Sequence, residues 1–231
     1  MSLIFIQNLS VGYGDQPVLD KVSFKAEAGE FVVIVGKSGS GKTTFLQALA
    51  KLIPFSGQIL MPSSLGFIFQ QHALFPWLTV SENIAFGLNS FAKDEEAQIV
   101  STHLKLAGIE NKKNTYPAEL SGGQIQRVAL ARSLAHNPKV LLMDEPYGSL
   151  DTYTRGKMQK WLLSVWEREK KTIIFVTHDI EEAIFMADRI LILKDGKFIK
   201  EFTIKDGRPR LPKIKFSHEF NRLREEIYNS L

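Results

Sequence analysis

The fold is decided by the stretch FVVIVGKSGSGKTTFLQAL, residues 31–49. It opens with an apolar run typical of a buried strand, passes through a glycine-rich loop at 36–43 and continues as a helical pattern. The loop matches G-x-x-x-x-G-K-S/T in the strand–loop–helix setting that this motif requires. Its glycines allow backbone N–H groups to point at phosphate oxygens, Lys42 supplies a positive charge and the Thr43 hydroxyl can bind Mg²⁺. The stretch therefore predicts a nucleotide site formed by Gly36, Lys37, Ser38, Gly39, Ser40, Gly41, Lys42, Thr43 and Thr44.

Apolar runs alternate with helical patterns along the rest of the chain. This alternation predicts an α/β fold with buried, largely parallel strands. The clearest helical pattern spans 153–169, residues 1–30 look like an antiparallel edge sheet, and 80–136 show helices without a convincing strand. We expect strands near 3–9, 19–26, 31–35, 65–69, 139–143, 171–176, 189–194 and 197–203.

Composition excludes several classes of protein. The chain contains no cysteine, so it has no disulfide, no thiolate metal site and no cysteine nucleophile. Its apolar runs are too short to cross a bilayer and its N-terminus does not resemble a signal peptide, so we expect a cytoplasmic location. The basic segment 194–215 is compatible with nucleic acid or anionic lipid, but it shows no aromatic platform of the kind that single-strand binders use. We interpret it as a solvated strand and loop and expect no nucleic-acid partner.

Chemically useful side chains follow two further apolar runs. Asp144 and Glu145 end the run that begins at Val140, which would bring two carboxylates to the edge of the sheet where ligands of such folds bind. Asp144 is suited to the Mg²⁺ shell and Glu145 to activating a water as general base. Acids at a strand end are also frequent as simple helix caps or in solvated turns. His178 follows the run at 171–176 and would reach the γ-phosphate.

A second glycine turn, LSGGQ at 120–124, also opens a helical pattern. Together with the phosphate loop, with Gln70, with the Asp144-Glu145 pair and with His178, it appears in the order found in ATP-binding-cassette (ABC) ATPases, the nucleotide-binding subunits of ABC transporters. The chain resembles this family over about residues 3–205. Lys37, Tyr147 and Ser149 depart from its usual residues without removing a catalytic group.

The resemblance implies a P-loop NTPase fold of the ABC ATPase type, with a mostly parallel core sheet, an N-terminal antiparallel sheet and an inserted helical subdomain. Residues 1–231 would form a single ABC ATPase domain. Its catalytic core would comprise 1–79 and 137–205, its helical subdomain 80–136 and its C-terminal helical tail 206–231.

The resemblance also assigns roles to residues. It implies a homodimer with ATP sandwiched at the interface, in which Ser121, Gly122, Gly123 and Gln124 of one subunit face the nucleotide held by the other. Tyr13 would stack on adenine, and Asp151 would lie in the loop after the carboxylate pair. The implied catalytic residues are Glu145, His178 and Gln70, and the implied Mg²⁺ ligands are Thr43, Gln70 and Asp144.

Within the family, PWLTVSENIAFGL (76–88) and YPAELSGG (116–123) resemble importer subunits for nitrate, sulfonate and taurine. This implies Mg²⁺-dependent ATP hydrolysis that drives solute uptake through separate permease subunits, at the cytoplasmic side of the membrane. A periplasmic or lipid-anchored solute-binding protein would be an indirect partner.

Three alternative functions compete with this hypothesis. A soluble ABC ATPase of DNA repair or translation usually carries two cassettes or a long coiled coil, and neither is present. A P-loop phosphotransferase would not need LSGGQ. A scaffold without turnover would not need Glu145, Gln70 and His178.

Two apolar segments stay outside these motifs. Phe75-Pro76-Trp77-Leu78 is interpreted either as a docking surface for the permease or as filling between subdomains. Near the C-terminus, Phe216, Phe220, Leu223 and Ile227 fall near one helical face, which predicts a short helix packed back on the core.

Overall fold

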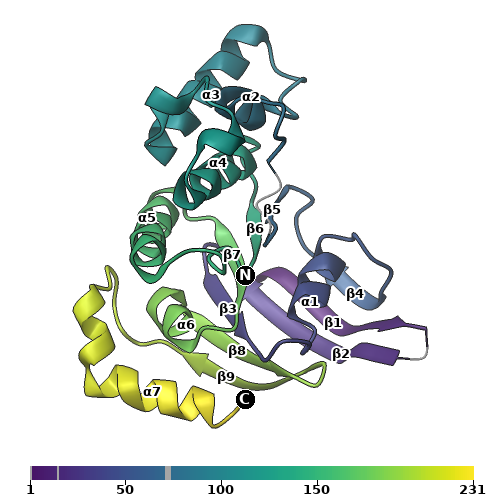
Figure 1. The fold of residues 1–231 in the computed structure, drawn as a ribbon. Helices are drawn as coiled ribbons and strands as arrows, with labels where there is room; N and C mark the ends of the chain where they lie inside the picture. Colours follow the sequence, from purple (N-terminus) through teal and green to yellow (C-terminus); the bar gives the residue numbers. More distant parts are fainter. Residues whose placement is uncertain (1, 15, 71–73) are drawn as a thin grey trace. The chain divides into compact units, whose positions relative to one another are not determined.

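The computed structural model describes residues 2–14, 16–70 and 74–231. The chain, whose ribbon is drawn in Figure 1, divides into two compact units. The first unit comprises Met1–Ser63, Leu142–Glu145 and Lys170–Leu231, and the second comprises Ser64–Leu141 and Pro146–Glu169. No helix among the described residues is long and apolar enough to cross a membrane.

The first unit contains the predicted antiparallel sheet. Its strands β1 (Ser2–Tyr13), β2 (Gln16–Glu27) and β4 (Ser56–Leu60) lie in the order β2-β1-β4. Alternate residues of β2 are buried, as expected for a sheet with one face on the core. Strand β4 was not predicted, because its sequence SGQIL is short, polar and almost entirely exposed.

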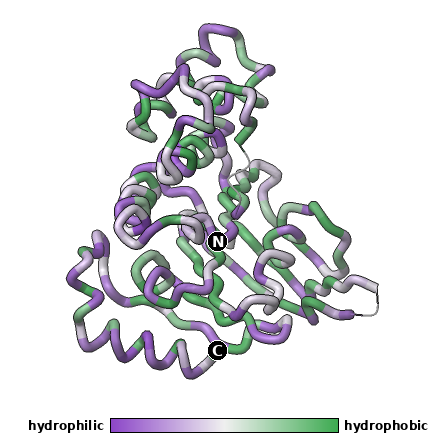
Figure 2. Tube along the Cα trace, viewed as in Figure 1, coloured by the Kyte–Doolittle hydropathy of each residue, from purple (hydrophilic) through white to green (hydrophobic). Residues whose placement is uncertain are grey.

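The larger sheet of the first unit carries the phosphate loop. Strands β6 (Val140–Asp144, of which Leu142–Asp144 belong to this unit), β7 (Thr172–Thr177), β3 (Phe31–Val35), β8 (Arg189–Lys194) and β9 (Lys197–Thr203) follow one another in that order. Strand β3 pairs in parallel with both β7 and β8, and β9 returns antiparallel to β8. Every residue of β3 and β7 is buried, which accounts for their continuous apolar runs (Figure 2). The predicted α/β fold is confirmed.

Helix α1 (Lys42–Leu49) follows the phosphate loop and contacts both β2 and β7. Its Phe45 ring packs edge-on against Phe24 of β2 and Phe198 of β9, at centroid distances of 6.1 and 5.3 Å. These aromatic contacts join the small sheet, α1 and the large sheet into one core, so the loop that precedes α1 rests on a rigid base.

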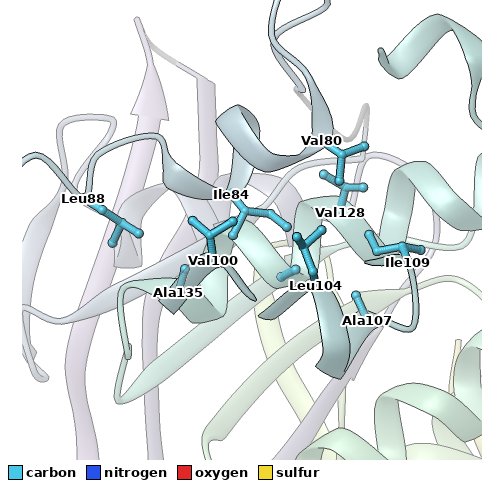
Figure 3. Close-up of a cluster of buried hydrophobic side chains, with 10 residues drawn as sticks. Val80, Ile84, Leu88, Val100, Leu104, Ala107, Ile109, Val128 and Ala135 are labelled. Carbon is cyan, nitrogen blue, oxygen red and sulfur yellow. The ribbon is translucent and has the colours of Figure 1, made fainter. Parts of the chain in front are cut away.

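The second unit is mainly helical. It contains β5 (Leu65–Ile68), α2 (Val80–Ala85), α3 (Lys93–Ala107), α4 (Gly122–Ala135) and α5 (Thr152–Glu169), with 3₁₀ turns η1 (Glu110–Lys112) and η2 (Pro117–Glu119). Residues 80–136 form no strand, and the exact bounds of a helical subdomain stay a prediction. Its core (Figure 3) consists of Val80, Ile84, Leu88, Val100, Leu104, Ala107, Ile109, Val128, Ala131 and Ala135.

The C-terminal segment contains η3 (Pro212–Phe216) and α7 (His218–Tyr228), and α7 contacts α6 (Ile180–Met186) of the same unit. A short helix thus lies where the amphipathic pattern predicted one. Phe220 and Ile227 are buried and Leu223 is half-buried. The assignment of Phe216 to this buried face was wrong, because it precedes the helix and is 86% exposed.

Gly57 allows β4 to approach β1. Its φ is +97°, and a Cβ added there would lie 2.3 Å from the carbonyl oxygen of Asn8. We expect Gly57→Ala to lower the free energy of unfolding by more than about 1 kcal/mol. Residues with a Cβ rarely adopt this φ, and the backbone of Asn8 leaves no room for a Cβ. A thermal melt of the purified chain measures the effect. Gly207→Ala is the matched control, since a Cβ at Gly207 meets nothing within 4 Å; equal melting temperatures for the two variants would contradict this account.

Candidate nucleotide-hydrolysis site

The phosphate loop leaves the end of β3 and enters α1 along a path that requires glycine. Gly41 caps α1 with φ +100°, and a Cβ at Gly36 would lie 2.4 Å from the carbonyl oxygen of Leu193. No acidic residue stands in the first turn of α1. The backbone N–H groups at this helix start are therefore left for an anion, and the helix dipole favours a phosphate there. Lys37, Ser38 and Gly39 form the exposed tip of the loop.

Lys42 is held inside the loop. Its side chain is 5% exposed, and Nζ donates to the carbonyl oxygens of Gly36 and Lys37 at 2.8 and 2.9 Å. Burial lowers the pKa of Lys42, whereas the nearby carboxylates of Glu145 and Asp144 act to raise it. The ammonium group thus lies in a site of low solvent access, where its attraction for a phosphate is stronger than at the surface.

Asp144 ends β6 and is 4% exposed. Its Oδ1 accepts a hydrogen bond of 3.2 Å from the Thr43 hydroxyl. Burial raises the pKa of Asp144; the Thr43 hydrogen bond and Lys42 act to lower it, and the charge of Glu145 acts to raise it. The described residues hold no cluster of three or more His, Cys, Asp or Glu able to bind a metal. One carboxylate with one hydroxyl is a donor set that fits Mg²⁺, which usually completes its shell with phosphate and water oxygens.

Glu145 and His178 meet beside Lys42. Glu145 Oε2 lies 2.8 Å from His178 Nδ1, and Oε1 lies 3.7 Å from Lys42 Nζ. The backbone of Glu145 has φ +41°, and its N–H donates to the carbonyl oxygen of Val176 at 3.0 Å. A non-glycine residue in the left-handed region is uncommon and is often found at functional sites. The structure therefore brings together five of the predicted residues: Lys42, Thr43, Asp144, Glu145 and His178.

Tyr13, at the end of β1 in the same unit, has a ring that is 56% exposed. An exposed aromatic face is able to stack on a planar base. Thr44 follows in α1 and is half-buried.

Ser40 of the phosphate loop is half-buried, and the other predicted residues belong to the second unit. Ser121 caps α4, where its Oγ accepts from the Gln124 N–H and Gln124 Oε1 accepts from the Ser121 N–H. Asp151 Oδ1 accepts from the backbone N–H groups of Tyr153 and Thr154, both at 3.0 Å, at the start of α5. The hydrogen bonds with Thr154 are the main cause of the lowered pKa of Asp151. Gln70 is exposed just after β5.

A hollow of about 320 Å³ opens beside the LSGGQ turn. Gly123 and Gln124 line it together with Arg127, Thr154 and Lys157. No acidic residue stands in the first turn of α4. A helix start flanked by two cations is suited to an anionic group such as a phosphate.

The sequence did not predict that Gln126 holds the backbone of the residue that follows Glu145. Its side chain is 2% exposed, and Nε2 donates at 2.8 Å to the carbonyl oxygen of Pro146, the residue after Glu145. Within QIQRVALARS it resembles an ordinary surface residue of a helix, so no local pattern distinguishes it.

Comparison with known proteins identifies the family. A family model described as ABC transporter matches residues 19–148, more than half of the chain. The chain belongs to the ABC transporter family. It is 44% identical to the aliphatic sulfonates import ATP-binding protein SsuB 1 of Paracoccus denitrificans, with 99% of this chain and 93% of that protein covered. It is 42% identical to an aliphatic sulfonates import ATP-binding protein SsuB of Bacillus cereus, over 93% of this chain and 88% of that protein.

Solved structures agree with this assignment. The dimeric post-hydrolysis structure of the ATP-binding cassette MJ0796 bound to ADP and Pi has a TM-score of 0.78 and 34% identity, covering 88% of this chain and all of that one. The structure of cbiO1 from Clostridium perfringens has a TM-score of 0.83 and 27% identity, covering 99% and 97%. The ABC ATPase fold and ATP hydrolysis predicted from the sequence are confirmed.

The buried carboxyl of Asp144 yields a prediction on stability. Its raised pKa means that the folded chain binds this proton more tightly than the unfolded chain does. The folded chain therefore loses stability as the pH rises above the ordinary value of 3.8 and through the raised value. We expect Asp144→Asn to raise the melting temperature of the nucleotide-free chain at pH 8. The rise should be about 2–4 °C for each kcal/mol by which the buried charge lowers the free energy of unfolding.

The gain should shrink as the pH is lowered through the raised pKa and disappear well below 3.8, where Asp144 is protonated in both the folded and the unfolded chain. Melting curves over this pH range measure it, with Asp151→Asn as the control, because the pKa of that fully exposed carboxyl is shifted downward instead. A melting temperature of Asp144→Asn below that of the wild type at pH 8 would contradict the assignment of a destabilising buried charge.

Proposed function

We propose that the chain is the ATP-hydrolysing subunit of an importer for a small organic sulfonate or a related solute such as taurine or nitrate. The family assignment and the sulfonate import proteins among its relatives support this proposal. The observation that carries the catalytic part is the contact of Glu145 with both Lys42 and His178 at the end of the parallel strands. The subunit would act at the cytoplasmic side of the membrane, with separate permease subunits and, indirectly, a periplasmic or lipid-anchored solute-binding protein.

The contacts of Lys42 and Glu145 support the following catalytic roles. Backbone N–H groups of the loop and Lys42 bind the β- and γ-phosphates, and Lys42 exchanges its two carbonyl acceptors for phosphate oxygens. Glu145 takes the proton of the attacking water, and the His178 hydrogen bond orients its carboxylate. Thr43, Asp144 and Gln70 would hold Mg²⁺, which when bound neutralises charge on the β- and γ-phosphate oxygens.

We further propose that two copies of the chain form a homodimer with ATP sandwiched at the interface. Ser121, Gly122, Gly123 and Gln124 would face the γ-phosphate held by the partner. The acid-free start of α4 and the cations around its hollow support an anion at this place. Tyr13 would stack on adenine, and Asp151, in the loop after the carboxylate pair, would contribute to nucleotide binding. The dimeric cassettes among the solved relatives are consistent with this assembly.

The permease is proposed to dock on an aromatic patch of the second unit, formed by Phe75, Trp77 and Phe86. Trp77 is 70% exposed and Phe86 52% exposed. The Phe75 ring lies 5.5 Å from the Trp77 ring and 4.3 Å from the Phe86 ring. Exposed aromatics in contact with one another are typical of interface anchors. The exposure of Trp77 argues against its being a buried filler residue.

Glu145→Gln tests the hydrolytic proposal. It preserves the shape of the side chain but removes the base, so we expect hydrolysis to fall by about 10²–10⁴-fold while ATP binding is retained. Size exclusion should show an ATP-dependent dimer of this variant, because bound ATP is no longer consumed. Steady-state ATPase measurements provide the rate. Hydrolysis close to wild type would remove Glu145 from the mechanism, and a wild-type chain that binds ATP without turnover would favour the scaffold alternative.

Trp77→Ala tests the docking surface. Because Trp77 is exposed, we expect the isolated variant to keep its melting temperature and its ATPase rate, while assembly with the permease weakens and solute uptake is lost. Tyr153→Ala is a matched control, since Tyr153 is a comparably exposed aromatic (71%) in helix α5, whereas Trp77 lies in the turn before α2. An early melt of Trp77→Ala, of the size expected for truncating a buried Trp, would defeat the docking proposal.

A further inference from the structure

The segment that follows β9 is fastened to the C-terminal end of α6 by two arginines. Arg210 is 6% exposed, and its Nη1 donates to the carbonyl oxygens of Ile184, Phe185 and Ala187. Arg208 donates to the carbonyl oxygen of Met186 and to Asp188. The last carbonyls of a helix have no partner within it, so these guanidinium groups complete the end of α6.

The same C-terminal segment also reaches the beginning of α6. Glu181, in the first turn of α6, lies 2.9 Å from Arg224 of α7 and 3.4 Å from Lys215 of η3. Phe220 and Ile227 are buried and anchor α7, which lies against α6 (Figure 1). The short helix α6 is thus held at both of its ends by residues that follow β9.

The beginning of α6 is where His178 is positioned. Asp179 is the N-cap of α6, and its N–H donates to the Thr177 hydroxyl at the end of β7. His178 lies between these two residues and reaches Glu145 at 2.8 Å. His178, Glu181 and Arg224 line one hollow of about 790 Å³. Because His178 directly precedes the N-cap of α6, a shift of the first turn of α6 would move His178 relative to Glu145.

We propose that Arg224 is a positioning residue for ATP hydrolysis: through Glu181, and together with Lys215, it fixes the first turn of α6 and so the approach of His178 to Glu145. This inference rests on the roles proposed above for Glu145 and His178. Arg224 and Glu181 are 47% and 40% exposed, and such ion pairs contribute little to global stability. We therefore expect the loss of this ion pair to change the rate of hydrolysis more than the stability, because a small displacement of a catalytic group slows the reaction.

Steady-state kinetics of the full chain test the proposal. We expect Arg224→Ala to lower kcat by about two- to fivefold, the range that an exposed ion pair can supply, with KM for ATP and the melting temperature unchanged. Arg224→Lys should restore most of the rate, because it keeps the positive charge. Glu181→Gln should give the same loss, and the double variant Glu181→Gln with Arg224→Ala should lose no more than either alone, since both act through one contact.

Arg222→Ala is the matched control. Arg222 lies on the same helix, but it pairs with Glu219 and Glu226 of α7 itself, so kcat should stay at the wild-type value. A normal kcat for Arg224→Ala, an equal loss in Arg222→Ala, or a lower melting temperature that accounts for the loss would overturn the positioning role. Failure of the proposed function is recognised separately: in that case the wild type does not hydrolyse ATP, or Glu145→Gln hydrolyses it normally.

Discussion

The parallel register between β3 and β7 is the constraint on which the site depends. Val35 pairs with Thr177, so the phosphate loop and His178 leave the sheet at the same edge. The Glu145 N–H bonds to Val176 of β7 and brings the end of β6 to the same place. Lys42, Glu145 and His178 come from segments far apart in the chain, yet the common edge places them within hydrogen-bonding or ion-pairing distance. Shifting one strand by a residue would turn its side chains to the opposite face.

The site is built at a cost to the stability of the free chain. Lys42 and Asp144 are both nearly inaccessible to solvent, and burial shifts the pKa of each toward its neutral form. Glu145 adopts a backbone conformation that most residues avoid. The fully buried strands β3 and β7 and the aromatic contacts of Phe45 offset these costs. Charges kept out of water interact more strongly with a nucleotide, so the same burial that destabilises the free chain strengthens binding.

The position of His178 also depends on the C-terminal segment, which lies outside the sequence motifs. Arg210 completes the end of α6 and Arg224 reaches its first turn, so the position of α6 depends on residues after β9 as well as on its own sequence. A seven-residue helix has little stability of its own and takes its position from tertiary contacts. The orientation of His178 is therefore a property of the whole first unit, including the segment that follows the strands.

The sequence by itself determined the phosphate loop, the strand-end carboxylates, the LSGGQ turn, the α/β class and the amphipathic helix near the C-terminus. Each of these features follows from a local sequence pattern: a spacing of glycines, an apolar run or a helical period. Only the tertiary structure decided that β4 pairs with β1, because SGQIL carries no apolar alternation and its pairing depends on the space that Gly57 leaves beside Asn8. It alone showed Phe216 exposed, Glu145 bonded to His178, and Arg208 and Arg210 bound to the end of α6. The contacts of Glu145, Arg208 and Arg210 join residues that are distant in the chain. Local patterns cannot specify such contacts, because they stabilise the chain only after the fold has brought both partners together.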